Sequence, residues 1–276
     1  MLDKLSYAAG DFGCNMSFSL AGTYFTLFYT QYMGIDSLAF AGILALRNFA
    51  RNRPALGAKF PMVAMYVGTY GAATATTVMF QSYFQNTSVS GLLSLMSYLP
   101  MFLFMPFIRK ITLRWGKKEA SQFGCLFSIL ATVLMLVLPI GPNASGMAMF
   151  FACPALNGFG MGIYMCVSNA MMADAIDYNE WKNGTREEGT TYALHSFFRK
   201  LAQGVGPSIG LVLMVRLGYD EALGSAQPFA VAQNMRYLVA AMYCVSAVLM
   251  WVSVDVIYNL DKKTLAQMEK DLGRTS

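Results

Sequence analysis

Apolar stretches long enough to cross a bilayer recur along almost the whole chain, and short polar breaks separate them. A hydrocarbon core of about 30 Å takes about 20 helical residues. Runs of that order cover approximately residues 5–33, 60–84, 89–108, 123–140, 147–173, 190–215 and 237–257. Since 56% of the 276 residues are apolar and only 13% are charged, the composition lies outside the usual range of soluble domains. The sequence therefore predicts an all-α polytopic membrane protein with about seven transmembrane helices.

The distribution of Lys and Arg predicts on which side of the membrane each loop lies, because short basic loops stay cytoplasmic. Three basic loops alternate with the uncharged loops 86–88 and 141–145 and with the acidic segment 220–233. The basic positions are Arg47, Arg51, Arg53 and Lys59, then Arg109, Lys110, Arg114, Lys117 and Lys118, then Lys182 and Arg186. The tail 260–276 is also basic, so its LAQMEKDL stretch is predicted to form a short cytoplasmic helix.

The first apolar run does not fit this alternation. Lys4 places its start inside, so one crossing delivers Gly34 to the outside, yet the basic segment from Arg47 must be inside. The apolar stretch 35–46 between them would cover only about 18 Å at 1.5 Å per residue, which is too short for a 30 Å core. One membrane crossing is therefore missing from the expected alternation, and an internal deletion in the chain would account for its loss.

Two stretches are specific enough to resemble a known family. They read KLSYAAGDFGCNMSFSLAGTYFTLFYTQYMGI and MMADAIDYNEWKNGTREEGTTYALHSFFRKLAQGVG. Both resemble the glycoside-pentoside-hexuronide cation symporters, the melibiose permease family of the major facilitator superfamily. The first stretch is similar to helix one of that family, and the second closely resembles its signature between helices ten and eleven. The resemblance implies a major facilitator-type helical bundle without most of helix two and without helices three to six. Residues 1–46 would hold the first helix and a remnant of the second, residues 47–259 the carboxy-terminal six-helix half, and residues 260–276 a cytosolic tail.

The resemblance also indicates sugar-binding residues. Asn15 matches a position where melibiose permeases carry a sugar-binding acid, although an intramembrane Asn also commonly packs helices together. Lys200 matches a lysine that faces the central cavity, and His195 matches a position that lines the sugar site. His195 is equally typical of a satisfied interior histidine. The aromatic candidates for a sugar platform are Tyr192, Phe197 and Phe198.

A second group of charges is implied to form a cytoplasmic gate. Asp174, Asp177 and Glu180 recur every three residues, which keeps them on one slowly drifting helical face, and Arg186 and Glu188 follow them. In the family such charges pair with the other half of the transporter when the inner side is closed. Alternating access then consists of rocking one half against the other.

The predicted function is transport of a glycoside or pentoside coupled to Na⁺ or H⁺, impaired in this chain because the helices that carry the family's cation site are absent. The alternative is a non-transporting membrane bundle that associates with another chain or a second copy. The implied location is the bacterial inner membrane, with the carboxy terminus cytoplasmic. No cofactor, metal site, nucleic-acid partner or enzymatic activity is predicted, because the cysteines lack metal-ligand spacing and no nucleophile and base can be assembled. Seven spans are also typical of retinal proteins, in which Lys200 would form the Schiff base. This third possibility is disfavoured, because no acid lies on an obvious facing helix.

Overall fold

The computed structural model describes residues 52–86, 89–184, 186 and 188–273. The chain divides into two compact units, Met1–Arg51 and Asn52–Ser276, and the described residues all belong to the second unit. Asn15, the first apolar run and the short stretch 35–46 lie outside the described residues. The predicted lost crossing and the role of Asn15 therefore stay predictions.

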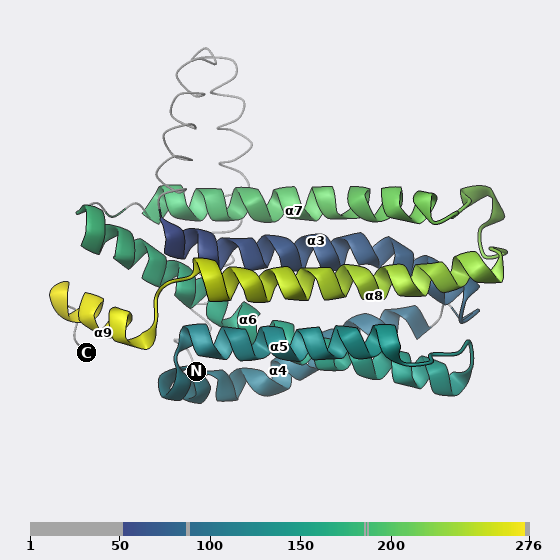
Figure 1. Ribbon diagram of the computed structural model, residues 1–276, viewed down its shortest axis with the longest axis horizontal. Coiled ribbons are helices and arrows are strands. Elements are labelled where there is room, and N and C mark those ends of the chain that lie inside the picture. The colour runs from purple at the N-terminus through teal and green to yellow at the C-terminus, as the bar shows by residue number, and fades with distance from the viewer. Residues whose placement is uncertain (1–51, 87–88, 185, 187, 274–276) are drawn as a thin grey trace, which may run out of the picture. The chain divides into compact units, whose positions relative to one another are not determined.

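Six long helices run roughly parallel in the described part of the chain (Figure 1). They are α3 (Arg53–Ser82), α4 (Ser90–Trp115), α5 (Lys117–Val137), α6 (Ala144–Asn183), α7 (Glu188–Arg216) and α8 (Phe229–Val252). The turn η2 (Glu221–Leu223) precedes α8, and η3 (Ser253–Ile257) continues it towards a short last helix, α9 (Lys262–Asp271). The helices coincide with the six apolar runs predicted between residues 60 and 257, and the described residues contain no strand. The all-α class is confirmed.

Local sequence signals set several helix ends. The side chain of Asn52 accepts a hydrogen bond of 3.0 Å from the backbone N–H of Ala55, which caps the start of α3. Asn143 caps α6 in the same way, accepting from the backbone N–H of Gly146 at 2.7 Å. Gly116, with φ at +112°, alone separates α4 from α5, and Gly184, with φ at +70°, ends α6. The basic loop predicted around residues 109–118 is thus almost entirely helical, because one glycine suffices for the turn.

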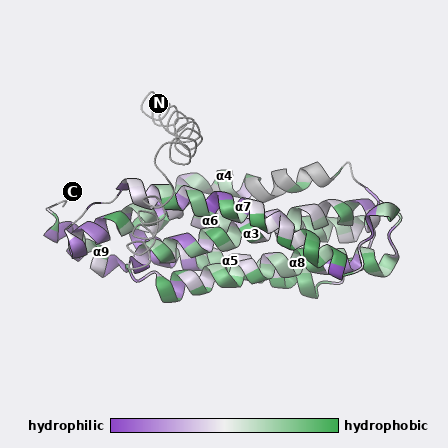
Figure 2. Cartoon of the chain, turned by 90° about the horizontal axis from the view of Figure 1, so that it is seen from above, coloured by the Kyte–Doolittle hydropathy of each residue, from purple (hydrophilic) through white to green (hydrophobic). Residues whose placement is uncertain are grey.

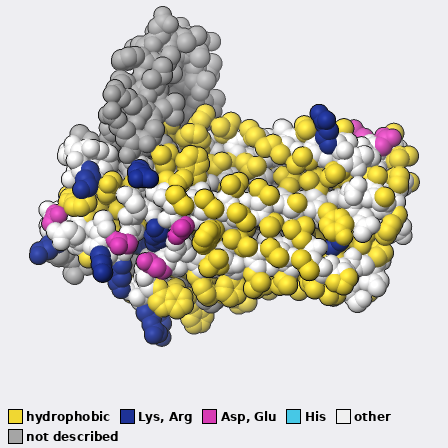
Figure 3. Space-filling model, in the orientation of Figure 1, with side chains coloured by type: hydrophobic (Ala, Val, Ile, Leu, Met, Phe, Trp, Pro, Cys, Tyr) yellow, Lys and Arg dark blue, Asp and Glu magenta, His cyan; other side chains and the backbone are white. Residues whose placement is uncertain are grey.

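The surface of this unit is apolar in the middle and charged at its ends, as a bilayer requires (Figures 2 and 3). Phe102 and Leu103 on α4 are 65% and 66% exposed, and Val137 at the end of α5 is 75% exposed. Large side chains of this kind are costly to leave in water over a wide area but suit a lipid environment.

Three of the described helices are both long and apolar enough to cross a membrane, judged by length and composition. They are α5, α6 and α8 together with η3. The helices α3, α4 and α7 have 30, 26 and 29 residues, which is ample length, and α3 and α7 are less apolar than α5, α6 and α8. In α7 this follows from polar side chains that are scattered among apolar ones; they include His195, Arg199, Lys200 and Gln203.

Small residues allow the helices to approach closely in the middle of the bundle. A Cβ atom on Gly124 of α5 would come within 2.6 Å of the carbonyl oxygen of Gly160 on α6. On the other side of the bundle, a Cβ atom on Gly210 of α7 would collide with the carbonyl oxygen of Gly71 on α3. Backbone contact between small residues is a common basis of helix association in membranes.

The predicted carboxy-terminal helix is present as α9 and packs against the end of α6. Met268 is 1% exposed, and Leu265 is buried beside it. The indole N–H of Trp181 on α6 donates a 3.0 Å hydrogen bond to Asp271, and the ammonium of Lys262 donates to the carbonyl oxygen of Leu113 at 3.0 Å. The apolar face of α9 therefore fastens the tail to the charged end of the bundle.

We expect Met268→Gln to loosen α9, because a polar amide would replace a fully buried side chain. Limited proteolysis after Lys262 and Lys263 should become several-fold faster than in the unchanged protein. Ala266→Gln is the matched control, since Ala266 lies on the exposed face of the same helix. Equal cleavage rates in the two variants would show that the burial of Met268 does not hold the tail.

Candidate functional site

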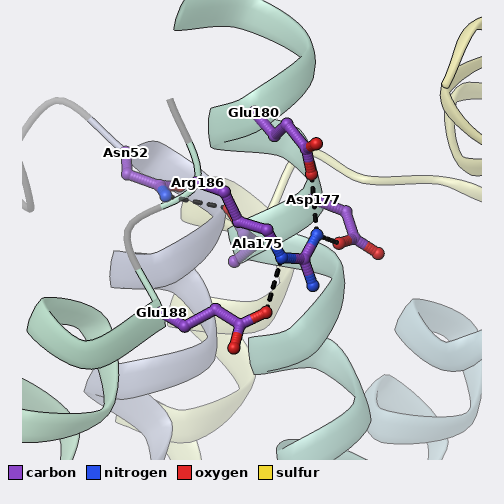
Figure 4. Close-up of polar contacts among 6 residues, drawn as sticks. All are labelled: Asn52, Ala175, Asp177, Glu180, Arg186 and Glu188. Atoms are coloured by element: carbon purple, nitrogen blue, oxygen red, sulfur yellow. Dashed lines mark hydrogen bonds and ion pairs between the residues drawn. The ribbon is translucent and has the colours of Figure 1, made fainter. Parts of the chain in front are cut away.

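Four of the five predicted gate residues come together around one guanidinium (Figure 4). Arg186, between α6 and α7, donates from Nη1 to Asp177 at 2.6 Å and to Glu180 at 2.7 Å, and its Nε donates to Glu188. Asp177 and Glu180 lie one turn apart near the end of α6, whereas Glu188 is the first residue of α7. Arg186 therefore ties the end of one helix to the start of the next.

The charges of this cluster are partly exposed. The side chain of Arg186 is 39% exposed, and those of Asp177 and Glu180 are 25% and 26% exposed. Hydrogen bonds to Glu180, Asp177 and Glu188 raise the pKa of Arg186 further above its ordinary range, so the guanidinium is charged at any accessible pH. Because α6 has 40 residues and a rise of 1.5 Å each makes it about 60 Å long, its charged end extends well beyond a 30 Å hydrocarbon core.

We expect Arg186→Gln to have a small effect on stability. Exposed ion pairs contribute about 0–1 kcal/mol each, and salt screens them. The apparent melting temperature in detergent should fall by no more than a few degrees, and the difference from the unchanged protein should shrink as the salt concentration rises. A large drop that is insensitive to salt would show that Arg186 supports the packing of α6 and α7.

Asp174, the fifth predicted gate residue, belongs to a different ion pair. Both of its carboxylate oxygens lie 2.7 Å from the ammonium of Lys117, at the start of α5. The side chain of Asp174 is only 10% exposed, and that of Lys117 is 31% exposed. This pair joins α5 to α6 within the described bundle, separately from the Arg186 cluster.

A line of polar side chains follows the contact between α3 and α7, which lie side by side (Figure 1). We call it the polar stripe; it consists of Lys59, Tyr66 and Tyr70 on α3 and His195, Arg199 and Gln203 on α7. Spacings of four and seven residues place each set of three on one helical face. The rings of Tyr66 and Tyr70 have centroids 5.9 Å apart, and the amide nitrogen of Gln203 lies 3.5 Å from the hydroxyl of Tyr70.

The polar stripe is buried at one end and open at the other. Lys59 is 2% exposed and His195 is 9% exposed, whereas Tyr70 is 39% exposed. The ammonium of Lys59 donates to the backbone carbonyl oxygen of His195, and the imidazole Nδ1 of His195 has no hydrogen-bond partner among the described residues. A sugar-sized ligand needs aromatic faces together with hydrogen-bonding groups, and the stripe offers both.

The structure corrects the place of Lys59. The sequence predicts Lys59 in a basic loop before the second apolar run, but it lies inside α3, about 9 Å along the helix from Arg53. The prediction was wrong because α3 already begins at Arg53, with Pro54 in its first turn, before the apolar run, so the lysine faces α7 rather than water. Burial of a lysine cannot be read from hydropathy alone.

His195 and Lys200, the predicted sugar-binding pair in this unit, lie on different faces of α7. At about 100° per residue, five positions separate them by roughly 140° around the helix axis. His195 is buried against α3, whereas Lys200 is exposed, as is the proposed aromatic residue Phe197. The structure thus brings His195 together with Lys59, and Lys200 stays a separate candidate.

Sequence reasoning missed the two tyrosines of the polar stripe. Tyr66 and Tyr70 sit in an apolar run, and only the pairing of α3 with α7 sets them beside Gln203. A four-residue spacing of His195, Arg199 and Gln203 was visible in the sequence as a polar face on α7. Among the described residues, no group of three or more His, Cys, Asp or Glu side chains is arranged to hold a metal ion.

Known proteins that resemble this chain are transporters. An uncharacterized symporter, YjmB, of Bacillus subtilis is 28% identical over 235 residues, covering 84% of this chain and 49% of its own length. A glucuronide carrier protein homolog of Escherichia coli is 25% identical over 222 residues, covering 80% of this chain and 47% of its own length. The isoprimeverose transporter of Lactiplantibacillus pentosus is 29% identical over 160 residues, covering 57% of this chain and 32% of its own length. The chain spans about half the length, or less, of these relatives.

These relatives agree with the predicted resemblance to sugar symporters and with the prediction that the chain is not an enzyme. The apolar helices agree with a membrane-embedded protein. Residues 43–262, most of the chain, match the family described as MFS/sugar transport protein. The chain therefore belongs to this family of sugar transporters within the major facilitator superfamily.

Proposed function

We propose that this chain takes part in the transport of a sugar across the bacterial inner membrane, coupled to Na⁺ or H⁺, with its carboxy terminus in the cytoplasm. The family match over residues 43–262 carries the proposal. The polar stripe supports it, because tyrosine rings, an amide and cationic groups on two packed helices are suited to a hydroxyl-rich ligand. The names of the relatives suggest a glucuronide and isoprimeverose as the first sugars to test.

We further propose that the chain on its own performs coupled transport poorly. Alternating access in this superfamily moves one six-helix half against another, and the described residues supply one bundle of six long helices. A single bundle encloses a sugar from one side only. It retains recognition groups but lacks the surface that would close over the ligand.

Uptake of radiolabelled sugar into proteoliposomes with an imposed Na⁺ or proton gradient tests this proposal. Slow entry above protein-free vesicles, with little accumulation against a gradient, is the expected result. Strong gradient-driven accumulation by this chain would overturn the impairment. Absence of both uptake and sugar binding would favour the alternative, a membrane bundle without transport activity.

The Arg186 cluster is proposed as a cytoplasmic gate. Its carboxylates and guanidinium lie at the charged end of α6, where another half could compete for them. A gate that is held by charge pairs biases two states, and its loss shifts the balance between them. Arg186→Gln should change the initial uptake rate several-fold with little effect on melting temperature.

Lys182→Gln is the matched control for the gate. Lys182 lies on the same helix end, but its ammonium sits 4.0 Å from the Trp181 ring centroid instead of on a carboxylate. If both variants transport at the unchanged rate, the Arg186 cluster is a surface network and not a gate.

Association with a second chain is the alternative function that we propose to test. Cys166 on α6 is partly exposed, so it can report on a neighbouring copy. Crosslinking through Cys166 in native membranes should give a dimer band if copies associate along this face. A monomer at every crosslinker length would exclude association there.

A further inference from the structure

An open groove of about 750 Å³ lies between α7 and α8, away from the polar stripe. Figure 1 shows α3 between these two helices; α3 packs against both of them, whereas α7 and α8 scarcely touch, so α3 forms the floor of the groove. On α3, the lining residues Phe60 and Ala64 lie about 100° and 140° around the helix axis from Lys59. On α7, the lining begins at Ile209, six residues beyond Gln203, where the stripe ends. The groove is therefore separate from the proposed sugar site.

The walls of the groove are apolar over most of their length. Leu213 on α7 and Val245 on α8 both line the groove and are exposed. Hydrocarbon, and not water, fills an apolar groove that is open along the side of a membrane-embedded bundle. From Asn234, at one end of the lining, to Val245, α8 rises about 16 Å, which is close to half of a 30 Å hydrocarbon core. This part of the groove therefore has the depth and the lining that suit the acyl chains of a lipid in one leaflet.

Three polar side chains line the end of the groove that lies farthest from α9. Arg216 is the last residue of α7, and Asn234 and Tyr237 lie in the first turns of α8. The ion pairs of the described residues do not include Arg216, and no described residue forms a hydrogen bond with the side chain of Arg216 or Asn234. A guanidinium, an amide and a phenol are donors to phosphate and ester oxygens, and tyrosine is enriched at the level of lipid headgroups. The groove thus has one polar end and one long apolar channel, as an amphipathic ligand requires.

A second guanidinium lies beside this polar end. Arg236 is only 3% exposed, and its guanidinium carbon lies 4.1 Å from the centroid of the Tyr237 ring. Its Nε has no hydrogen-bond partner among the described residues. Asp220 and Glu221, the acids of the neighbouring loop, form an ion pair with neither Arg216 nor Arg236. Two arginines that are not neutralised by a carboxylate complement a ligand with a negative headgroup.

We infer that the groove between α7 and α8 is a binding site for one anionic phospholipid. Arg216 binds the phosphate, and Asn234 and Tyr237 donate to the oxygens at the head of the lipid. The acyl chains lie along Leu213 and Val245. Because α7 and α8 scarcely touch, the lipid fills the space between them and holds α7 against α3. This site is independent of the proposed sugar transport.

Two phospholipids with the same acyl chains but different headgroups test the site. Native mass spectrometry of the detergent-purified chain counts the phosphatidylglycerol or phosphatidylcholine molecules that each chain retains during a titration. The unchanged chain should retain one phosphatidylglycerol and bind it about tenfold more tightly than phosphatidylcholine, since only phosphatidylglycerol has a net negative charge. Phosphatidylglycerol should also raise the apparent melting temperature more than phosphatidylcholine at the same concentration, because a ligand of the folded state stabilises it.

Two pairs of variants assign the binding to this groove. Arg216→Gln should abolish the preference for phosphatidylglycerol, whereas Arg114→Gln, its matched control, removes an exposed arginine at the α9 end of the bundle and should retain the preference. Ala241→Phe fills the groove about 10 Å along α8 from Asn234 and should weaken the binding of both lipids. Val248→Phe is its control, because Val248 is exposed on α8 outside the groove. Melting curves without added lipid separate lost binding from lost folding, and Ala241→Leu replaces Ala241→Phe if the larger side chain lowers the melting temperature.

Four results would overturn the inference. Equal retention of the two lipids by the unchanged chain would exclude an anionic headgroup as the ligand. Equal loss of the preference in Arg216→Gln and Arg114→Gln would show that the overall surface charge attracts the lipid. Unchanged lipid binding in the variants of Ala241 would show that the lipid binds elsewhere. A dimer that these variants dissociate would show that a second copy of the chain occupies the groove.

Discussion

Gly160→Val is expected to unfold the bundle at a markedly lower temperature than any surface change. A Cβ atom at this position would collide with the carbonyl oxygen of Gly124 and come within 2.7 Å of the backbone nitrogen of Ser128. Both of these atoms belong to the backbone of α5, so they cannot move aside as a flexible side chain would. Overpacking of this kind costs about 1–3 kcal/mol or more, because α5 and α6 must separate.

The melting temperature of the detergent-solubilised protein measures this effect. Gly204→Ala is the control, because Gly204 lies in the interior of α7 with no atom within 4 Å of an added Cβ. Since alanine is the better helix former, the control should be unchanged or more stable by up to about 1 kcal/mol. A melting temperature for Gly160→Val close to that of the control would contradict the close approach of α5 and α6.

Lys117→Met is expected to destabilise the protein more than Asp174→Asn. The carboxylate of Asp174 is only 10% exposed, so removal of the lysine leaves a buried negative charge without its partner. Loss of one member of a buried pair costs about 3–5 kcal/mol, and partial access to water reduces this figure. Lys117, at 31% exposure, can turn towards water when its acid is neutralised, which makes the reverse change milder.

A double-mutant cycle tests this asymmetry. Lys117→Met combined with Asp174→Asn should cost less than the sum of the single changes, since neither charge is then left alone. Lys118→Met is the matched control, because the neighbouring Lys118 donates only to the backbone carbonyl of Asp255 at 3.0 Å on an exposed surface. Strict additivity of the two single changes would show that the pair contributes nothing to stability.

The sequence alone determined the helices and the family. Apolar runs of about 20 residues predict where α3 to α8 lie, because the bilayer imposes both the length and the composition of a spanning segment. The motif that ends α6 and begins α7 identified the transporter family, and it placed Asp177, Glu180, Arg186 and Glu188 close enough in the chain to meet. Contacts within one turn of helix, or across a short connection, follow from local geometry.

Only the tertiary structure decided which polar groups meet across helices. Asp174 pairs with Lys117, which lies 57 residues away, and Lys59 meets His195 at a separation of 136 residues. Hydropathy treats Lys59 as a loop residue and Tyr66 as part of an apolar run, because it scores residues one at a time. Lys59 and Tyr66 lie in the polar stripe because of the way α3 packs against α7. In that packing Gly71 and Gly210 are in close contact.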